Sequence, residues 1–394
     1  MVKHKIPRKV HHVLIALPVL LVGGTEIQTL SLVRVLLSAG YEVTICCYYE
    51  YDLKVVDWFH KAGAQVILLC LERKQNKFGL LTIFSLIRSL FSSFRTLQPD
   101  IIHVQYLAPG LVPIITARLA GMRKVISTVH IAGSYAYGTK AKVLLRIASF
   151  LCDRFICVSR GVEEFWFGES QVFDPANGQK SRKHYTVYNA IDTAAIAKVV
   201  NTTDKAKIKK DMNIEGRPVI GIVGRLAVQK GHSILLDAMM QIVKEIPDVI
   251  LIVIGEGPER QKLMTQSAVL KLDENIMWLG ALPQEKVFEL YAIMDIFVMP
   301  SLYEGFGLTA AEAMAASLPV VGTNIEGLSE VIEDGVSGCL VPQGDIQAFS
   351  TALVKLLKEP AKAATLGQNG RIRADSLFSL VHFKKSMLAL YSSL

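Results

Sequence analysis

The sequence predicts an α/β protein made of two doubly wound parallel sheets with a cleft between them. Three observations support this fold class. A chain of 394 residues is long enough for two domains. Strand-like runs of Val, Ile, Leu and Cys alternate with helical patterns, as in parallel sheets covered by helices on both faces. This alternation stops in a polar region near the middle of the chain and then begins again.

The first half contains six continuous apolar runs that we expect to be buried parallel strands. They are Val13–Leu17, Glu42–Cys47, Gln65–Leu69, Ile101–Val104, Lys124–Thr128 and Arg154–Val158. The segments between these runs have helical patterns, such as the amphipathic one that follows Gly24. Strands that alternate with helices in this way predict one doubly wound sheet.

Two polar stretches, Glu169–Lys183 and Asn201–Lys210, separate this pattern from its repetition in the second half, and we place the hinge between residues 183 and 216. The alternation begins again with the apolar run Pro218–Gly224. Further strands are expected at Val249–Ile254, Ile276–Leu279, Ile296–Met299, Pro319–Val321 and Gly338–Leu340. We therefore place one domain at residues 1–195 and a second at residues 196–378. Ligands of open parallel sheets bind beyond the carboxyl ends of the strands, so two facing sheets predict one shared site.

The composition indicates a cytoplasmic protein. Hydrophobic residues make up 51% of the chain, but no apolar run reaches the roughly 18–20 residues that span a bilayer. Basic Met1–His12 followed by apolar Val13–Gly23 resembles a signal peptide, although a buried first strand that ends in two glycines explains the same residues. The six cysteines form no CxxC pattern and no zinc spacing, which fits a reducing compartment.

Basic residues are concentrated in the first half of the chain. Residues 1–195 contain 23 Lys and Arg against 13 Asp and Glu, whereas residues 196–394 contain 20 against 22. This asymmetry predicts an anionic partner for the first half only. Anionic lipid fits better than nucleic acid, because the basic residues lack the aromatic interleaving of nucleic-acid-binding patterns. The run from Arg73 to Arg95 is typical of an amphipathic helix on an anionic membrane, although a core-packed helix with a solvated basic face explains it equally well.

The most informative segment is Glu304–Glu312, in which Gly-Phe-Gly lies between two carboxylates that are eight positions apart. It follows the predicted strand Ile296–Met299 and leads into the helix-forming run Ala-Glu-Ala-Met-Ala-Ala. Free N–H groups at the start of such a helix bind anions, especially phosphate. The two carboxylates can accept hydrogen bonds from hydroxyl groups of the same ligand. Phosphate and hydroxyl groups together indicate a nucleotide sugar.

Other candidate residues lie where predicted strands end. Arg225 and Lys230 flank the loop after the first strand of the second half, and two cations suit a diphosphate, although a solvated loop has the same composition. His130 ends a strand of the first half, where a histidine is either structural or directed at a ligand. Gly24 begins a helix and either lets a phosphate approach the backbone or forms a tight turn. The metal-binding pattern Asp-x-Asp does not occur, so charge neutralisation would come from cations and helix N-termini.

In combination, these segments resemble the retaining GT-B glycosyltransferases of family four, which include bacterial mannosyl- and glucosyltransferases. The resemblance covers nearly the whole chain, and its specific part is the pair of glutamates with the upstream arginine and lysine. The segments that carry it, in family order, are Gly23–Glu26, Thr128–His130, Val223–Leu226, Lys230–Gly231, Gly255–Pro258, Leu279–Gly280, Pro300–Gly307, Glu312–Ala315 and Gly327–Glu330.

The resemblance implies a GT-B fold of two Rossmann-like domains and a role for each matching residue. The catalytic residues would be Glu304, His130, Arg225 and Lys230. The donor-binding residues would be Gly24, Arg225, Lys230, Gly255, Leu282, Gly305, Phe306, Gly307, Leu308, Thr309 and Glu312. The first domain would bind the acceptor, the second would bind the donor, and a last helix at residues 379–394 would pack back on the first domain.

The implied reaction is the transfer of a hexose from a UDP- or GDP-sugar to an acceptor hydroxyl with retention of anomeric configuration. The acceptor would be lipid-linked or a glycan precursor of the cell surface, as in polysaccharide biosynthesis at the cytoplasmic face of the membrane. We expect no metal, no other cofactor and no nucleic acid. Two alternatives remain: a UDP-sugar 2-epimerase of the same architecture, and a non-catalytic nucleotide-binding protein.

Overall fold

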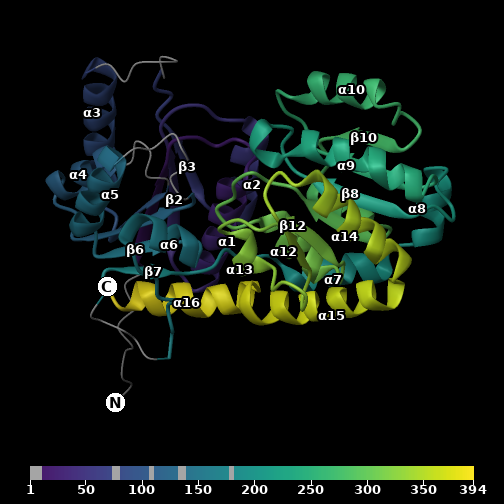
Figure 1. Ribbon diagram of the computed structural model, residues 1–394. Helices are drawn as coiled ribbons and strands as arrows, with labels where there is room; N and C mark the ends of the chain where they lie inside the picture. The colour runs from purple at the N-terminus through teal and green to yellow at the C-terminus, as the bar shows by residue number, and fades with distance from the viewer. Residues whose placement is uncertain (1–10, 73–79, 106–110, 132–138, 177–181) are drawn as a thin grey trace. The chain divides into compact units, whose positions relative to one another are not determined.

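The computed structural model describes residues 11–72, 80–105, 111–131, 139–176 and 182–394 (Figure 1). The chain forms two compact units. The first consists of Met1–Tyr188 together with Phe383–Leu394, and the second consists of Asn189–His382. Each unit is built on its own parallel sheet with helices packed against it, as in Rossmann-like domains. The predicted fold class is therefore confirmed.

The sheet of the first unit has seven parallel strands within the described residues, in the order β3-β2-β1-β4-β5-β6-β7. They are β1 (His12–Leu17), β2 (Glu42–Cys47), β3 (Gln65–Leu68), β4 (Ile101–Gln105), β5 (Lys124–Val129), β6 (Arg154–Cys157) and β7 (His184–Thr186). The six predicted strands agree with β1 to β6 within one residue at each end. Strand β7 was not predicted, because a three-residue strand in a polar region shows no periodicity.

The helices of the first unit follow the strands in alternation. They are α1 (Gly24–Ser38), α2 (Leu53–Ala62), α3 (Leu80–Leu97), α4 (Leu111–Leu119), α5 (Thr139–Leu151) and α6 (Arg160–Phe167). Right-handed crossovers put α1 and α2 on one face of the sheet and α3 to α6 on the other. In agreement, α1 packs against α2, while α4 packs against both α3 and α5. Most of α16 (Leu380–Ser392) also belongs to this unit.

The second unit has a six-stranded parallel sheet within the described residues, in the order β10-β9-β8-β11-β12-β13. The strands are β8 (Val219–Val223), β9 (Ile250–Ile254), β10 (Ile276–Gly280), β11 (Ile296–Met299), β12 (Val320–Thr323) and β13 (Cys339–Val341). All six agree with the prediction within two residues. Their apolar side chains form a core that includes Ile220, Val253 and Val298, each at most 3% exposed.

The helices of the second unit begin with α7 and α8, which lead into the sheet. They are α7 (Thr193–Thr202), α8 (Lys205–Asp211), α9 (His232–Glu245), α10 (Arg260–Val269), α11 (Gln284–Tyr291), α12 (Leu308–Ala315), α13 (Leu328–Val331), α14 (Ile346–Lys358) and α15 (Pro360–Leu377), with a short 3₁₀ turn at Val228–Lys230. Aspartates cap three of these helices: Asp192, Asp204 and Asp345 each accept a hydrogen bond from a backbone N–H of the first turn.

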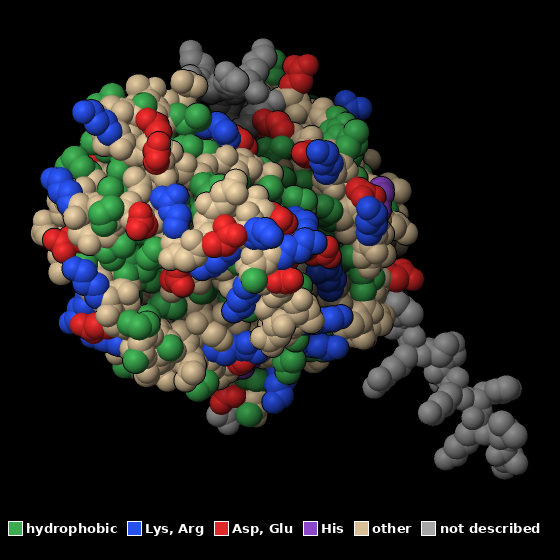
Figure 2. Space-filling view, turned by 90° about the vertical axis from the view of Figure 1, so that its right-hand side faces the viewer, with side chains coloured by type: hydrophobic (Ala, Val, Ile, Leu, Met, Phe, Trp, Pro, Cys, Tyr) green, Lys and Arg blue, Asp and Glu red, His purple; other side chains and the backbone are tan. Residues whose placement is uncertain are grey.

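The surface on the side of α8 and α10 has an ordinary distribution of charge. Figure 2 shows this face, where basic and acidic side chains are interspersed among apolar ones. Several charges of the second unit are paired, including Lys286 with Glu289 and Lys262 with Glu259. None of the helices in the described part of the chain is long and apolar enough to span a membrane.

Candidate functional site

The order of strands in the second unit reverses between β8 and β11. The chain continues from β8 to β9 on one side and from β11 to β12 on the other, while β8 and β11 pair directly. Loops that leave two adjacent strands in opposite directions open a crevice beyond the carboxyl ends of those strands. Residues 224–231 follow β8 and residues 300–307 follow β11. The two loops that carry the predicted cations and the first predicted carboxylate therefore meet at this point.

An ion pair joins these two loops. The Nζ atom of Lys230 lies 2.6 Å from Oε2 of Glu304, and the two side chains are 22% and 16% exposed. The structure thus brings together two predicted residues that are 74 positions apart in the chain. Arg225 lies at the start of the same loop as Lys230, and its side chain is exposed. Partial burial strengthens a charge-assisted hydrogen bond of this kind and fixes both groups.

Close backbone contacts hold the neighbouring loops against this pair. A Cβ atom on Gly231, where φ is +67°, would lie 1.9 Å from the carbonyl oxygen of Pro300. A Cβ atom on Gly255, where φ is +144°, would lie 1.9 Å from the carbonyl oxygen of Gly224. Only glycine permits such contacts. The loops after β8, β9 and β11 therefore form one layer, and Gly255, which we predicted to bind the donor, has a packing role in it.

Helix α12 starts directly after this layer. Gly307 precedes it with φ of +99°, and no side chain caps its first turn. The backbone N–H groups of Leu308 and Thr309 lie in this first turn, where helices have no internal acceptors. Phe306 is buried and packs edge-on against Phe378, with ring centroids 5.1 Å apart. The aromatic ring at this predicted position therefore belongs to the core.

The second predicted carboxylate, Glu312, lies one turn further along α12. Its side chain is 8% exposed and accepts a hydrogen bond of 3.1 Å from the hydroxyl of Tyr291. Burial raises the pKa of Glu312 to about 7, although hydrogen bonds from Tyr291 and Gln284 oppose this rise. A buried carboxylate of this kind is an acceptor for a hydroxyl group when it is ionised.

Two buried polar side chains, one in the loop after β11 and one at the start of α9, were not predicted from the sequence. Among the described residues, both ring nitrogens of His232 and the hydroxyl of Ser301 are buried without a hydrogen-bond partner. Burial lowers the pKa of His232 to about 4, and the charge of Lys230 adds to this effect. The only signal in the sequence is their position next to predicted residues. Of the remaining predicted residues, Leu282 and Gly305 are partly exposed in the loops after β10 and β11.

In the first unit, His130 follows β5 and is part of a buried polar network. Its Nε2 lies 2.7 Å from Oε1 of Gln105, which ends the adjacent strand β4. The amide nitrogen of Gln105 lies 3.3 Å from Nε2 of His103. The same Nε2 atom is 2.7 Å from the hydroxyl of Thr128, and Nδ1 of His103 is 2.7 Å from the hydroxyl of Tyr391 on α16. Gln105 therefore connects His130 to the end of α16.

The chemistry of this network determines where the protons lie. The Gln105 amide nitrogen can only donate, so Nε2 of His103 accepts, and Nδ1 of His103 carries the proton. The Gln105 carbonyl oxygen can only accept, so Nε2 of His130 carries its proton and Nδ1 keeps a lone pair. Burial lowers the pKa of His130 to about 4 and that of His103 to about 3. Both rings are therefore neutral at pH 7.

Gly24 begins helix α1, and no side chain caps the first turn of this helix. Glu26 lies in that turn and is 5% exposed. Burial raises the pKa of Glu26 to about 7, although hydrogen bonds from backbone groups at Glu26 itself and at Leu21 oppose the rise. Glu26 is not among the predicted site residues. Its position in the Gly-Gly-Thr-Glu segment was the available signal.

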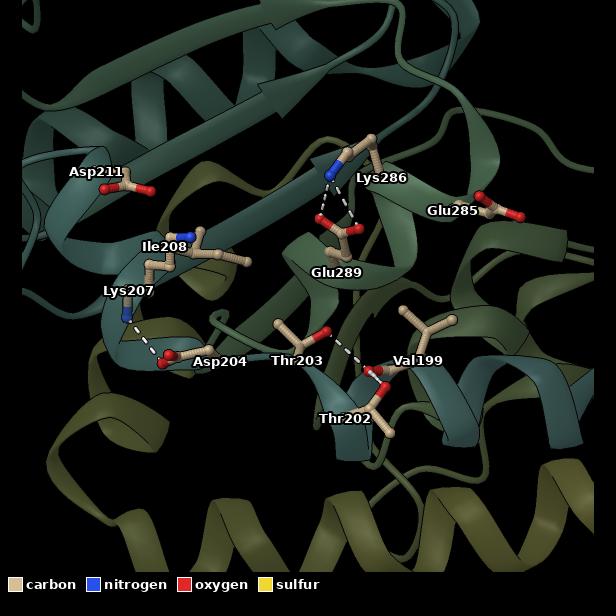
Figure 3. A pocket seen from close by; sticks show the side chains of 10 residues that line it. All are labelled: Val199, Thr202, Thr203, Asp204, Lys207, Ile208, Asp211, Glu285, Lys286 and Glu289. Carbon is tan, nitrogen blue, oxygen red and sulfur yellow. Dashed lines mark hydrogen bonds and ion pairs between the residues drawn. The ribbon is translucent and has the colours of Figure 1, made fainter.

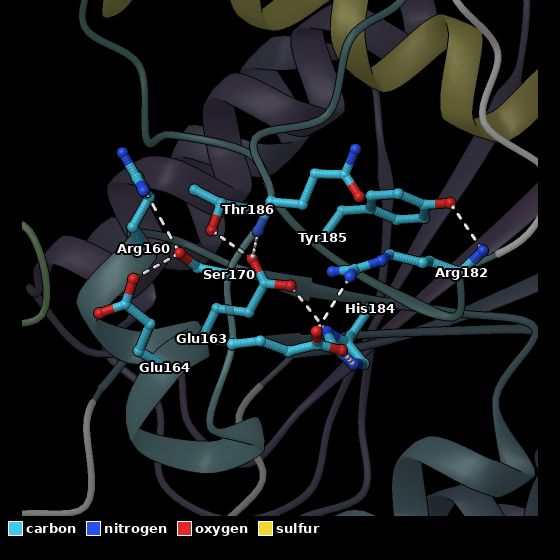
Figure 4. Close-up of polar contacts among 10 residues, drawn as sticks. Arg160, Glu163, Glu164, Ser170, Arg182, His184, Tyr185 and Thr186 are labelled. Carbon is cyan, nitrogen blue, oxygen red and sulfur yellow. Dashed lines mark hydrogen bonds and ion pairs between the residues drawn. The ribbon is translucent and has the colours of Figure 1, made fainter.

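Two further polar clusters do not include any predicted site residue. Figure 3 shows a groove of about 500 Å³ on α7, α8 and α11, whose lining includes the ion pair of Lys286 and Glu289. Figure 4 shows a cluster at the β7 edge of the first sheet, where Glu163 is fully buried. The carboxylate of Glu163 accepts hydrogen bonds from Nδ1 of His184 (2.7 Å) and the hydroxyl of Thr186 (2.6 Å), and this attaches β7 to α6. Within the described residues, no three His, Cys, Asp or Glu side chains are grouped so that they could hold a metal ion.

Comparison with known proteins gives matches along both halves of the chain. The family description "Glycosyl transferases group 1" matches residues 204–373, and "Glycosyltransferase Family 4" matches residues 22–194. One relative is the GDP-mannose-dependent alpha-(1-6)-phosphatidylinositol monomannoside mannosyltransferase of Mycolicibacterium smegmatis, which is 30% identical over 42% of this chain and 46% of its own length. Another is the UDP-Gal:alpha-D-GlcNAc-diphosphoundecaprenol alpha-1,3-galactosyltransferase of Escherichia coli, which is 30% identical over 68% of this chain and 70% of its own length.

Among solved structures, Anabaena HepE in complex with UDP-glucose is similar, with a TM-score of 0.80. It covers 97% of this chain and 100% of its own length at 21% identity. The two Rossmann-like units therefore have the GT-B fold, and the family matches along both halves of the chain identify a glycosyltransferase. The chain belongs to glycosyltransferase family four, the family of the group 1 glycosyl transferases.

Proposed function

We propose that this enzyme transfers a hexose from a UDP- or GDP-sugar to an acceptor hydroxyl with retention of anomeric configuration. The observation that carries the proposal is the ion pair of Lys230 and Glu304 at the β8–β11 switch point. This pair lies in the loop layer that precedes the uncapped start of α12 and the buried carboxylate of Glu312. Cations and free N–H groups bind the phosphates of a sugar nucleotide, and carboxylates bind its hydroxyl groups.

Each group in the second unit has a part in this proposal. Lys230, Arg225 and the first turn of α12 would bind the diphosphate, because cations and helix N-termini both stabilise negative charge. Glu304 would then exchange its bond with Lys230 for hydroxyl groups of the donor sugar. Glu312 would accept hydrogen bonds from the ribose. Relatives named for GDP-mannose and UDP-galactose support a donor of this class.

The proposed chemical step is a front-face substitution at the anomeric carbon. The bond between this carbon and the diphosphate oxygen breaks, and a bond to the acceptor oxygen forms on the same face. The acceptor proton goes to an oxygen of the departing diphosphate, so the products are a nucleoside diphosphate and a glycoside. The protein positions the reactants and stabilises the charge that develops on the leaving group. We propose that Lys230 and Arg225 supply this stabilisation without a metal, and that His130 takes part from the first unit.

We propose a lipid-linked acceptor or a cell-surface glycan precursor, bound by the first unit at the cytoplasmic face of the membrane. The relatives support this class of acceptor, because one is named for phosphatidylinositol monomannoside and another for a sugar-diphosphoundecaprenol. The positive net charge of residues 1–195 suits such anionic lipids.

The test is incubation of the purified protein with single UDP- and GDP-hexoses and short-chain polyprenyl-diphosphate sugars, with and without EDTA. Release of nucleoside diphosphate together with an α-linked product, identified by NMR, is the expected result, and Lys230→Ala should abolish most of it. A new sugar that is still attached to the nucleotide would instead identify an epimerase. A β-linked product from an α-linked donor, or loss of activity with EDTA, would contradict retention or metal independence respectively.

A further inference from the structure

Three of the helices on one face of the first sheet are unusually poor in acidic residues. Between Glu72 and Asp153 the sequence contains eleven Lys and Arg but a single acidic residue, Asp100. Helices α3, α4 and α5 all lie in this segment, and together their 40 residues include six Lys and Arg and no Asp or Glu. A soluble surface normally mixes both signs of charge, as the face of α8 and α10 does in Figure 2.

Helix α3 has an apolar inner side and also exposes large apolar side chains on its outer side. The inner stripe of Leu86, Leu90 and Phe94 is buried against the unit. The outer stripe repeats every three to four residues and consists of Leu81, Phe84, Arg88, Phe91 and Arg95, all of which are exposed. The exposed side also carries Ser85, Ser92 and Thr96, so α3 by itself also fits the alternative of a core-packed helix with a solvated face. The three exposed large apolar side chains gain their meaning from the neighbouring helices. The part of the predicted amphipathic helix between Arg73 and Lys77 lies outside the described residues.

The outer stripe of α3 continues onto the neighbouring helices. Helix α4 packs against α3 on one side and α5 on the other (Figure 1). Exposed large hydrophobic side chains on α4 and α5 are Ile115, Leu119, Val143, Leu144, Ile147 and Phe150. The most exposed members of the set are Leu81 at 85% and Phe150 at 74%. We call this combined surface of α3, α4 and α5 the α3–α5 face.

At the edge of the α3–α5 face one cation lies over an aromatic ring, and another is paired with the adjacent acid. The Lys183 ammonium lies 4.6 Å from the centre of the Phe150 ring. Asp153, which ends the acid-poor segment, is paired with Arg118 at 3.0 Å and also accepts a hydrogen bond from the backbone N–H of Val125. The negative charge next to the face is thus compensated, and the exposed Arg88 and Arg95 on α3 are set between apolar side chains.

We propose that the α3–α5 face binds the surface of an anionic phospholipid bilayer, with the three helices lying at the interface. Exposed Leu, Ile and Phe side chains would enter the boundary between headgroups and acyl chains, while Arg and Lys would contact lipid phosphates. Charge complementarity favours this partner over a second copy of the chain, because two such faces in contact would bring only like charges together. The proposal deepens the lipid-linked acceptor proposed above, but membrane binding requires neither donor nor acceptor and is tested without them.

The experiment is flotation of the full chain with extruded vesicles, made either of phosphatidylcholine alone or of phosphatidylcholine with about 30 mol% phosphatidylglycerol. We expect binding to the anionic vesicles that weakens as NaCl rises from about 50 to 500 mM. Each Lys or Arg at an anionic surface contributes roughly fivefold to partitioning, so Arg88→Ala with Arg95→Ala should reduce binding roughly 25-fold. Phe84→Glu with Phe150→Glu should abolish it.

Matched controls replace equally exposed residues of the second unit. The control for the loss of cations is the double variant Lys205→Ala with Lys210→Ala. The control for the loss of apolar side chains is the double variant Val269→Glu with Ile372→Glu. Both lie outside the α3–α5 face and should leave flotation unchanged. Melting temperatures of all variants exclude unfolding as the cause of lost binding. If wild-type protein does not float with anionic vesicles, or if both pairs of face variants float like wild type, the proposal is wrong. The wild-type protein could instead fail to float and form a dimer that is lost in the variant with Phe84→Glu and Phe150→Glu. That result would identify the face as an interface between copies of the chain.

Discussion

Replacement of Glu312 by glutamine tests how the buried carboxylate behaves. Burial raises the pKa of Glu312 from its ordinary value of 4.5 to about 7. A difference of about 2.5 pKa units corresponds to roughly 3 kcal/mol, because each unit is worth 1.36 kcal/mol. The folded protein binds this proton more tightly than the unfolded chain does. Its contribution to stability is therefore fully present below pH 4.5 and is lost as the pH rises through 7.

A glutamine side chain at this position would keep an acceptor for the Tyr291 hydroxyl but would never ionise. The substitution Glu312→Gln should therefore be more favourable to stability at pH 8 than at pH 4.5 by up to roughly 3 kcal/mol. For a unit of this size, roughly 1 kcal/mol shifts the melting temperature by about 2–4 °C, so the gain over wild type should differ by roughly 6–12 °C between the two pH values. Differential scanning calorimetry measures the melting temperatures of variant and wild type at each pH. The control is Glu326→Gln, which changes an exposed carboxyl group.

The same variant should lose donor affinity if Glu312 binds the ribose as proposed. A hydrogen bond to a charged group contributes about 1.5–3 kcal/mol, which corresponds to a roughly 10- to 150-fold weaker Kd for UDP or GDP by isothermal titration calorimetry at pH 8. A melting-temperature difference between variant and wild type that is equal at both pH values would refute the argument from burial. Unchanged nucleotide affinity would refute the assigned contact while leaving that argument intact.

Three other predictions follow from the contacts described. Lys230→Ala should reduce kcat on the order of 10²–10³-fold, as for a lost oxyanion donor, and a near wild-type kcat would rule out its assigned role. Gln105→Glu should raise the pKa of His130 above about 4, because a carboxylate that accepts from Nε2 stabilises the imidazolium. The acidic limb of the pH–kcat profile should therefore move to higher pH. An unmoved limb would contradict the proposed hydrogen bond between His130 and residue 105. Glu163→Ala should destabilise the first unit by about 1–3 kcal/mol in urea unfolding, because it leaves buried donors without an acceptor. The exposed Glu164→Ala is the control for that loss, and equal effects of the two would contradict the argument.

The sequence predicted the two sheets well because parallel strands buried on both faces are continuous apolar runs. It also identified residues at the ends of strands, and this placed Lys230 and Glu304 in one site despite their distance in the chain. Strand β7 could not be predicted, because three residues carry no periodicity and the strand is recognised only by its tertiary contacts, the pairing with β6 and the hydrogen bonds to Glu163 of α6.

Properties that depend on burial could not be predicted from the sequence either. Glu312 was selected as an acceptor of hydroxyl groups, but its raised pKa follows from the packing around it. Gln105 gave no signal, since its link to His130 depends on the register between β4 and β5. For α3, composition indicated lipid, but only the exposed positions of Phe84 and Phe91 show which side chains face outward.

The bond between Tyr391 and His103 has a consequence for the order of folding. Residues 383–394 complete the first unit, yet the ribosome makes them only after the entire second unit. Until then the buried Nδ1 of His103 on β4 lacks its partner, so the newly made first unit remains an incomplete intermediate during translation. Removal of the last twelve residues should therefore loosen the amino-terminal half of the polypeptide, which hydrogen exchange at the amides of β4 would register.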